Sequence, residues 1–240
     1  GGSAPAAALA NAPAPAASAD APASPAPAAA AVPTADEAAW RALAERWKLP
    51  ADAIDGEAAL CRVARDRGLA CHRARAGLAA LRRLDRPALL WLDGGSGEGA
   101  TRLALLEGLD RDGARLRLGA VEQDVPIATL QARWRGEFAT LWRPPPGWVA
   151  PQIDGRETPA AKWVAERLGR LQRNLPAMIT AAEAAASDPL ARDAAFEARV
   201  RAFQRSQGLV ADGVLGPMTL MQLNRAAGID EPRLARADGG

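Results

Sequence analysis

The sequence predicts an α+β domain followed by a small all-helical domain. Apolar residues recur at helical spacing through residues 34–84. The spacing of apolar residues then changes. The run ALLWL at 88–92 and the alternation of Leu116 and Leu118 with arginines are typical of strands. Beyond residue 157 only helical spacing recurs. Helices followed by an antiparallel sheet indicate an α+β domain.

Three helices are predicted before the sheet. Thr34 and Glu37 have the spacing of a capping box, and the helix that they start ends near Pro50. A second helix is expected over 55–68, closed by a glycine that suits the left-handed final position. The third covers 78–84 and is closed by a proline.

The sheet is predicted from one apolar run and one hairpin. An Asp-Gly pair at 112–113 favours a tight turn between segments 102–109 and 114–120. A short helix at about 127–135 precedes a final strand at 137–142.

The helical domain is predicted from its start and stop residues. Thr158 caps a helix that has proline in its first turn, and Asp188 repeats that pattern. Gly208 closes the second of these helices, and Gly216 with Pro217 opens the last one.

Composition sets the boundaries between these parts. The first 33 residues are mostly Ala and Pro with one charge, and as an extended linker they could reach about 100 Å. A Pro-rich connection, in which apolar residues recur at neither helical nor strand spacing, divides the two folded parts. We therefore expect a disordered linker at 1–33, the α+β domain at 34–143, the connection at 144–157, the helical domain at 158–230 and a flexible tail at 231–240.

Charge and hydropathy exclude two classes of partner. The net charge is +2 and both signs are interspersed, so no nucleic-acid partner is predicted. There is no run of 18 or more apolar residues, so no membrane contact is expected of this region. The chain starts with Gly-Gly-Ser instead of Met, as expected for a segment of a longer protein.

The stretch FEARVRAFQRSQGLVADGVLGPMTLMQL at 196–223 is the most informative. It resembles the small three-helix peptidoglycan-binding domain of bacterial cell-wall proteins. The residues that carry this resemblance are Phe203, Gln204, Gly208, Leu209, Asp212, Gly213, Gly216, Thr219 and Leu223.

A structural role explains most of these residues, because the large apolar ones suit a core and the glycines suit turns. The resemblance leaves a smaller set as predicted peptidoglycan contacts. An uncapped helix start at Gly216 suits a stem carboxylate, and Asp212 suits an amine. The predicted contacts are Arg201, Gln204, Asp212, Gly213, Gly216 and Thr219.

The stretch WLDGGSGEGATR at 91–102 comes close to two nucleotide-binding motifs. A phosphate loop needs Lys immediately before its hydroxyl residue, and Ala100 stands there. The dinucleotide motif needs a helix next, whereas a strand is predicted. No nucleotide, metal or other cofactor is expected.

The order of elements over residues 36–143 resembles the papain-like cysteine peptidase domain that removes double-glycine leader peptides. That resemblance implies a Cys at the start of an early helix, a His on the strand after the loop and an Asp after the next strand. Here 100–102 read Ala-Thr-Arg and 121–123 read Val-Glu-Gln. The only histidine, His72, directly follows Cys71, and neighbours on an extended segment point to opposite faces. No catalytic residue is therefore predicted, and this region is expected not to be an enzyme.

The two cysteines, Cys61 and Cys71, have three interpretations. A metal site would find only a third ligand in His72. Buried thiols would be ordinary core residues. Outside the cytoplasm a disulfide is favoured, with a contribution of about 2–3 kcal/mol.

A papain-like domain without its catalytic residues, followed by a wall-binding domain, resembles the periplasmic part of the general secretion pathway protein A family. The resemblance implies a periplasmic region of an inner-membrane-anchored protein that binds peptidoglycan. It also implies work with secretion pathway protein B, indirect action on the outer-membrane secretin in type II secretion, and formation of a homo-oligomer. The rival class is a cell-wall hydrolase or cysteine peptidase that is only targeted by the wall-binding domain.

Overall fold

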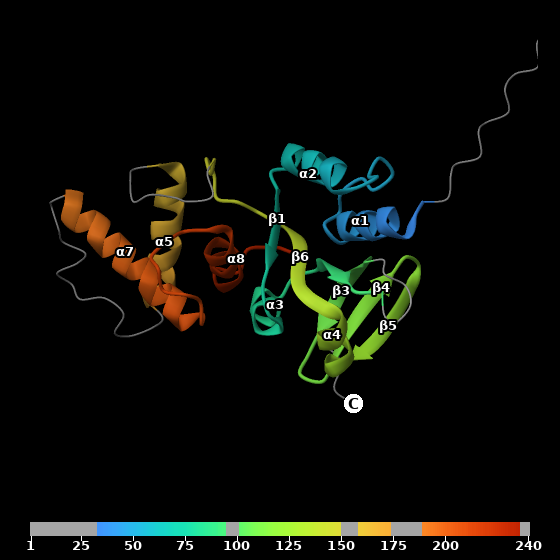
Figure 1. Cartoon of the computed structure of the whole chain (residues 1–240). Helices are drawn as coiled ribbons and strands as arrows, with labels where there is room; N and C mark the ends of the chain where they lie inside the picture. The colour runs from blue at the N-terminus through green and yellow to red at the C-terminus, as the bar shows by residue number, and fades with distance from the viewer. Residues whose placement is uncertain (1–32, 95–100, 150–157, 174–188, 236–240) are drawn as a thin grey trace, which may run out of the picture. The chain divides into compact units, whose positions relative to one another are not determined.

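The computed structural model describes residues 33–94, 101–149, 158–173 and 189–235 (Figure 1). Residues 33–240 form one compact unit, separate from 1–32. Apart from Pro33, the predicted linker therefore lies outside the described residues. The fold is α+β, as predicted, with helices packed on a six-stranded sheet.

Every strand of the sheet pairs antiparallel with its neighbours, in the order β1-β6-β2-β3-β4-β5. The predicted hairpin is present, with Leu106 opposite Leu116 across β3 and β4. The strands are β1 (Ala70–Arg75), β2 (Ala88–Leu92), β3 (Arg102–Leu109), β4 (Gly113–Leu118), β5 (Val121–Pro126) and β6 (Trp134–Trp142).

The two edge strands, β1 and β5, were not predicted from the sequence. β1 carries only small apolar residues between polar ones, and β5 has no fully buried residue. Neither strand buries large side chains at alternate positions. The sequence of each edge strand therefore lacks the alternation of apolar and polar residues that predicts a strand. Backbone pairing to a central neighbour defines both strands.

One face of the sheet is covered by α1 (Ala35–Arg46) and α2 (Glu57–Asp66) (Figure 1). The predicted capping box is present, since Thr34 N donates to Glu37 Oε2 at 2.7 Å and Glu37 N donates to Thr34 Oγ1 at 3.2 Å. A Cys61–Cys71 disulfide joins α2 to β1, which confirms that interpretation of the cysteines. The buried core on this face includes Trp40, Leu43, Leu60, Leu89, Leu105 and Leu141.

The opposite face of the sheet shares a core with the C-terminal helices. The helices on this side are α3 (Leu78–Leu84), α4 (Ile127–Arg133), α5 (Pro159–Arg173), α7 (Pro189–Ser206) and α8 (Pro217–Ala226). α5 starts as predicted, with Ala161 N donating to Thr158 Oγ1 at 3.0 Å, whereas Asp188 lies outside the described residues. One continuous cluster of buried side chains contains Leu81, Leu90, Phe138 and Trp142 together with Val164, Phe203, Leu220 and Leu223. The two predicted domains are thus fused through one core.

A buried ion pair lies where these two parts meet. Arg86 and Glu231 have side chains 3% and 5% exposed, and Arg86 Nη2 lies 2.9 Å from Glu231 Oε2. The same guanidinium donates to the carbonyl oxygens of Leu141 at 3.2 Å and Met221 at 3.3 Å. One side chain therefore holds the end of β6, α8 and the C-terminal segment together.

Glu231 uses its second carboxylate oxygen in the same way. Glu231 Oε1 accepts from Arg143 N at 2.8 Å and from Asn224 Nδ2 at 3.1 Å. Asn224 Nδ2 also donates to the Arg143 carbonyl oxygen at 2.7 Å. The carboxylate is thus paired and hydrogen-bonded on both oxygens, which is what a buried charge requires.

The prediction of a flexible tail at 231–240 is wrong for residues 231–235. Beyond Glu231, Leu234 is buried and Ala235 forms a parallel bridge with Gly108 of β3. Ala235 N donates to the Glu107 carbonyl oxygen at 2.7 Å, on the stretch of β3 that extends past the start of β2. The segment is held by a buried charge and a backbone bridge, neither of which hydropathy reveals.

We expect the variant Glu231→Gln to lower the free energy of unfolding by about 3–5 kcal/mol, because it leaves the Arg86 charge buried without a counter-charge. Urea denaturation of the two proteins measures this difference. Asp93→Asn is the control, since it removes a pair with Arg135 whose side chains are 48% and 68% exposed. The control should cost no more than about 1 kcal/mol. Equal losses in both variants would contradict a structural role for the buried pair.

Candidate peptidoglycan-binding site

The wall-binding motif forms α7, a turn over residues 207–216 and α8. Gly208 ends α7 with φ +64°, and Gly213 turns the chain again with φ +79°. A Cβ at Gly213 would also lie 2.7 Å from Glu197 Cγ and 3.1 Å from Arg201 Nε. The positive φ favours glycine at 213, and a larger residue there would also displace the side chains of Glu197 and Arg201.

The turn is held from inside by the Gln204 side chain, which is 1% exposed. Gln204 Nε2 donates to Asp212 Oδ1 at 2.8 Å, to the Val214 carbonyl oxygen at 2.9 Å and to Thr219 Oγ1 at 3.1 Å. Gln204 Oε1 accepts from Gly213 N at 2.9 Å. We call Gln204, Asp212, Gly213, Val214 and Thr219 the glutamine clamp.

The glutamine clamp separates the predicted contact residues into two groups. Gln204 and Thr219 are buried, and their polar groups are engaged within the clamp. Arg201 and Asp212 are exposed. The buried pair thus shapes the turn, and the exposed pair together with the glycine backbone lies where a ligand can reach it.

Two charges lie at the surface of this turn. Hydrogen bonds from Val214 N and from Gln204 lower the pKa of Asp212, so its carboxylate is ionised at neutral pH. Arg201 Nη2 pairs with Glu197 Oε1 at 2.7 Å and reaches the Asp212 carbonyl oxygen at 3.4 Å. The contribution of Glu197 was not foreseen, although its spacing of four residues from Arg201 predicts such a pair.

The start of α8 faces the other end of the turn. Its N-cap, Gly216, makes no side-chain capping bond, and Pro217 occupies the first turn. The backbone N–H groups and the positive end of the helix dipole are therefore without a side-chain cap, as the prediction for a stem carboxylate requires.

The peptidase resemblance can be compared with the geometry at the start of α1. Leu103 N, at the beginning of β3, donates to Asp36 Oδ1 at 3.4 Å. The start of α1 and the start of β3 thus lie in contact. Asp36 and Leu103 occupy this contact, and neither is a thiol or an imidazole. Ala100 and the rest of 95–100 lie outside the described residues.

The chain's cysteines and histidine lie elsewhere and apart. Both cysteine sulfurs are in the disulfide. Cys71 packs with the core under α1 and α2, whereas His72 contacts Phe138 on the other face, with ring centroids 6.0 Å apart. Burial, and secondarily the Arg86 charge, lower the pKa of His72. The predicted opposition of Cys71 and His72 is confirmed.

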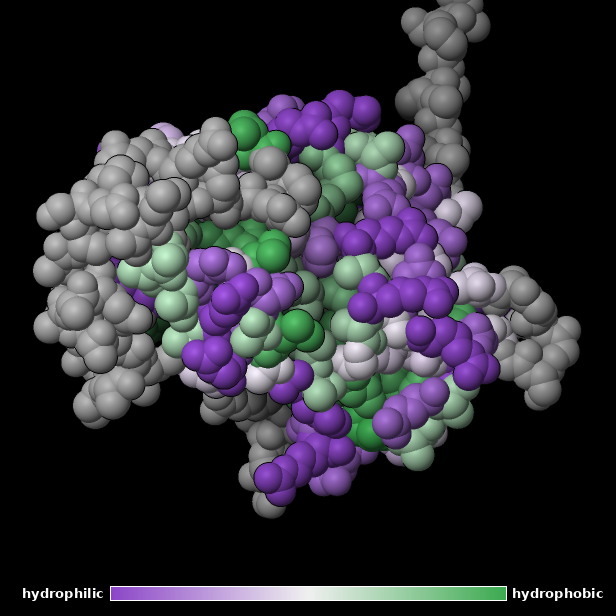
Figure 2. All heavy atoms as spheres, turned by 60° about the vertical axis from the view of Figure 1, so that its left-hand side comes forward, coloured by the Kyte–Doolittle hydropathy of each residue, from purple (hydrophilic) through white to green (hydrophobic). Residues whose placement is uncertain are grey.

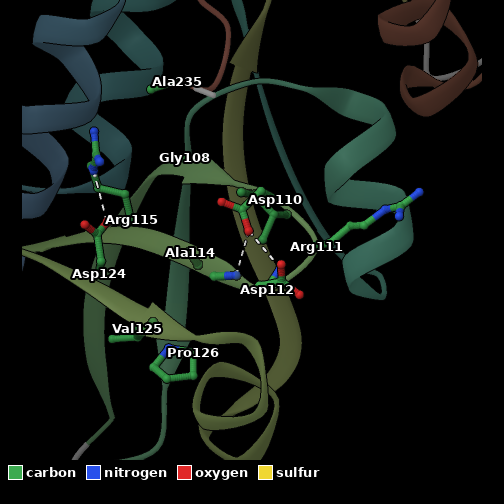
Figure 3. Close-up of a pocket in the computed structure, with 12 residues that line it drawn as sticks. Gly108, Asp110, Arg111, Asp112, Ala114, Arg115, Asp124, Val125, Pro126 and Ala235 are labelled. Carbon is green, nitrogen blue, oxygen red and sulfur yellow. Dashed lines mark hydrogen bonds and ion pairs between the residues drawn. The ribbon is translucent and has the colours of Figure 1, made fainter. Parts of the chain in front are cut away.

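A hollow of about 720 Å³ lies at the tip of the β3–β4 hairpin, beside the end of β5 and Ala235 (Figure 3). Asp110 accepts from the backbone N–H groups of Asp112 at 2.8 Å and Gly113 at 2.7 Å, which lowers its pKa. Asp124 pairs with Arg115 at 3.1 Å. A hydrolase acid needs a raised pKa, so Asp110 is unsuited to that role.

A metal site, a dinucleotide site and a membrane-spanning helix find no support in the described part of the chain. No cluster of three or more metal-ligating side chains occurs there. The glycine-rich stretch leads into β3, where the dinucleotide motif requires a helix. None of the described helices combines the length and the apolar character needed to cross a membrane.

Replacing Gln204 by Ala should lower the free energy of unfolding by about 2–3 kcal/mol, because the buried and part-buried hydrogen bonds of its side-chain amide are lost together. Thermal unfolding followed by circular dichroism measures the effect. Gln207→Ala is the matched control, because its side-chain amide makes one exposed hydrogen bond, to Ser206. A Gln204 variant as stable as this control would show that the clamp does not hold the turn.

Stability should also depend on the protonation of His72, the only histidine. Its pKa is lowered in the folded state, so below an unfolded pKa of about 6.5 the unfolded chain takes up a proton first. Between pH 7.5 and 5.5 the free energy of unfolding should fall by at most about 1.4 kcal/mol per pH unit. The variant His72→Gln should lack this loss in urea titrations at the two pH values. A wild-type slope matching the variant would refute the assignment.

Comparisons with known proteins agree with the motif. Residues 190–223 match the model of a putative peptidoglycan binding domain. General secretion pathway protein A of Aeromonas hydrophila is 32% identical over 178 residues, which are 74% of this chain and 30% of that relative. The chain thus spans under a third of the relative's length.

Two solved structures are also similar. A periplasmic domain of the EpsAB fusion protein of the Vibrio vulnificus type II secretion system is 25% identical, with a TM-score of 0.40 over 69% of this chain and 68% of that one. The peptidase C39 like domain of a Vibrio parahaemolyticus toxin secretion ATP-binding protein is 21% identical, with a TM-score of 0.36 over 47% and 99%. The fold described above rests on the strand order and packing of this chain. The match to the relative and the domain model together make this chain similar to the periplasmic region of general secretion pathway protein A.

Proposed function

We propose that this chain is a non-catalytic region that binds peptidoglycan through the turn between α7 and α8. The observation that carries the proposal is the coincidence of the matched residues 190–223 with a turn that a buried glutamine holds in place. A preorganised turn loses little conformational freedom on binding, so its exposed groups can contribute their full interaction to affinity.

The proposed ligand groups follow from the chemistry of the wall, whose peptide stems offer carboxylates, amides and an amine. The uncapped start of α8 at Gly216 suits a carboxylate. The ionised Asp212 suits the amine, and Arg201 and the Gly213 backbone complete the surface. Gln204 and Thr219 act from inside by holding these groups in position.

We place the chain in the periplasm, where it would work as part of an inner-membrane-anchored protein of type II secretion. A disulfide persists in such an oxidising compartment, and the similar proteins belong to secretion systems. Secretion pathway protein B, and through it the outer-membrane secretin, are the proposed partners. A homo-oligomer on the wall and help in assembling the secretin are part of this proposal.

The two parts of the chain divide this work. Residues 158–230 carry the wall-binding surface, and residues 34–143 provide the sheet against which that surface is held. The disulfide occupies both cysteine sulfurs, which supports a holding role for 34–143 over peptide cleavage.

The full chain should sediment with purified peptidoglycan sacculi, and Arg201→Glu should weaken that binding several-fold because it reverses a charge beside the turn. The bound fraction is measured by co-sedimentation over a range of sacculus concentrations. Arg65→Glu is the control, since Arg65 is exposed on α2 and the same charge reversal occurs away from the turn.

Thermal shifts separate the rival functions. Soluble peptidoglycan fragments should raise the unfolding temperature, whereas ATP and NAD should not, because only a ligand of the folded state stabilises it. Release of shortened wall fragments or cleaved peptides by the chain would instead favour the hydrolase or peptidase. Absence of sedimentation by the wild-type chain would overturn the proposed function.

A further inference from the structure

The arginine-rich end of α3 contains one charge that stands apart from its neighbours. Arg82 donates to the carbonyl oxygens of Asp110 at 2.9 Å and Arg111 at 3.4 Å. Asp85 pairs with Arg225 at 3.2 Å and with Arg233 at 3.3 Å. Arg86 is in the buried pair with Glu231. Arg83, between them, makes neither an ion pair nor a hydrogen bond within the described residues.

Arg83 lies against the wall-binding turn. A Cβ placed on Gly208 would lie 2.8 Å from Arg83 Nη1 and 3.5 Å from Arg83 Cζ. Gly208 is the residue at which α7 ends and the turn begins, and its φ of +64° is unfavourable for other residues. Arg83 Nε is buried and lacks a hydrogen-bond partner in the described part of the chain. A side chain from the sheet part thus fills space that a larger residue at 208 would occupy.

We propose that Arg83 is a further peptidoglycan contact, which binds a carboxylate of the peptide stem from the sheet side of the turn. This inference rests on the proposed function. Arginine presents its N–H groups in a planar fork that matches a carboxylate, and Arg83 need not break an ion pair with another described side chain to bind one.

The position of Arg83 is fixed from both sides. Its neighbours Arg82 and Arg86 hold the end of α3 to the hairpin and to α8. The glutamine clamp holds the turn itself, since Leu209 N also donates to the Gln204 carbonyl oxygen at 2.8 Å. The wall-binding surface therefore extends across both parts of the chain, and the fused core keeps its two halves in register.

The experiment uses the full chain and purified sacculi, native and with their free carboxylates amidated. Arg83→Gln should bind native sacculi about tenfold more weakly than wild type, or about 1.4 kcal/mol. Arg83→Lys should recover part of the loss. Arg67→Gln is the matched control, because Arg67 is exposed beyond α2 and loses the same charge.

Amidation identifies the group that Arg83 meets. Wild type should lose affinity on amidated sacculi, whereas Arg83→Gln should lose less, because only the contact at the start of α8 then remains to be lost. If wild type binds native sacculi and Arg83→Gln binds them as Arg67→Gln does, the inference about Arg83 is wrong and the proposed function stands. If the Arg83 variant unfolds at a lower temperature and its remaining sensitivity to amidation equals that of wild type, Arg83 is structural and the inference is again wrong. Failure of wild type to bind would instead count against the proposed function.

Discussion

The buried pair of Arg86 and Glu231 constrains more of this molecule than any other interaction. Two opposite charges removed from water need each other and further hydrogen bonds, because an unpaired buried charge costs several kcal/mol. Here those bonds reach the end of β6, α8 and the segment that follows α8. The pair therefore ties these three pieces to one another at the place where the helices meet the sheet. The hydrophobic core shared by both parts supplies the stabilisation.

The candidate site depends on that arrangement indirectly, through the core that α3, α7 and α8 share. Gln204 holds the turn, and α7 and α8 on either side of the turn contribute to the same core as α3. The turn therefore keeps its shape and also its position relative to Arg83. Among the described residues on the face shown in Figure 2, hydrophilic and apolar patches are interspersed. Recognition by a few placed polar groups suits a ligand made of sugars and short peptides.

Sequence patterns predicted the elements that pack large apolar side chains. The helix capped at Thr34, the β3–β4 hairpin and the helix opened by Pro217 follow from local residue chemistry, and they are present. The edge strand β5 could not be predicted, because none of its residues is fully buried and pairing with the neighbouring backbone defines it. Glu231 could not be assigned either, since a charged residue near the end of a chain is ordinarily solvated and its partner is 145 positions away. In the site, the motif predicted Gln204 and Thr219 as peptidoglycan contacts, and the structure buries both side chains inside the turn. Their burial reverses the role that polarity suggested, because sequence alone does not show on which side of a turn a side chain lies.

The cysteines and the histidine of this chain lie apart from one another. A disulfide consumes both thiols and links α2 to β1. The imidazole of His72 lies on the other face of the sheet. This arrangement supports the proposal that the sheet holds a binding surface in place. Hydrogen exchange of the full chain, with and without soluble peptidoglycan fragments, tests this most directly. The account predicts that bound fragments slow amide exchange across residues 201–219 and leave the edge strand β5 unchanged. Slowed exchange in the sheet alone, with residues 201–219 unaffected, would contradict it.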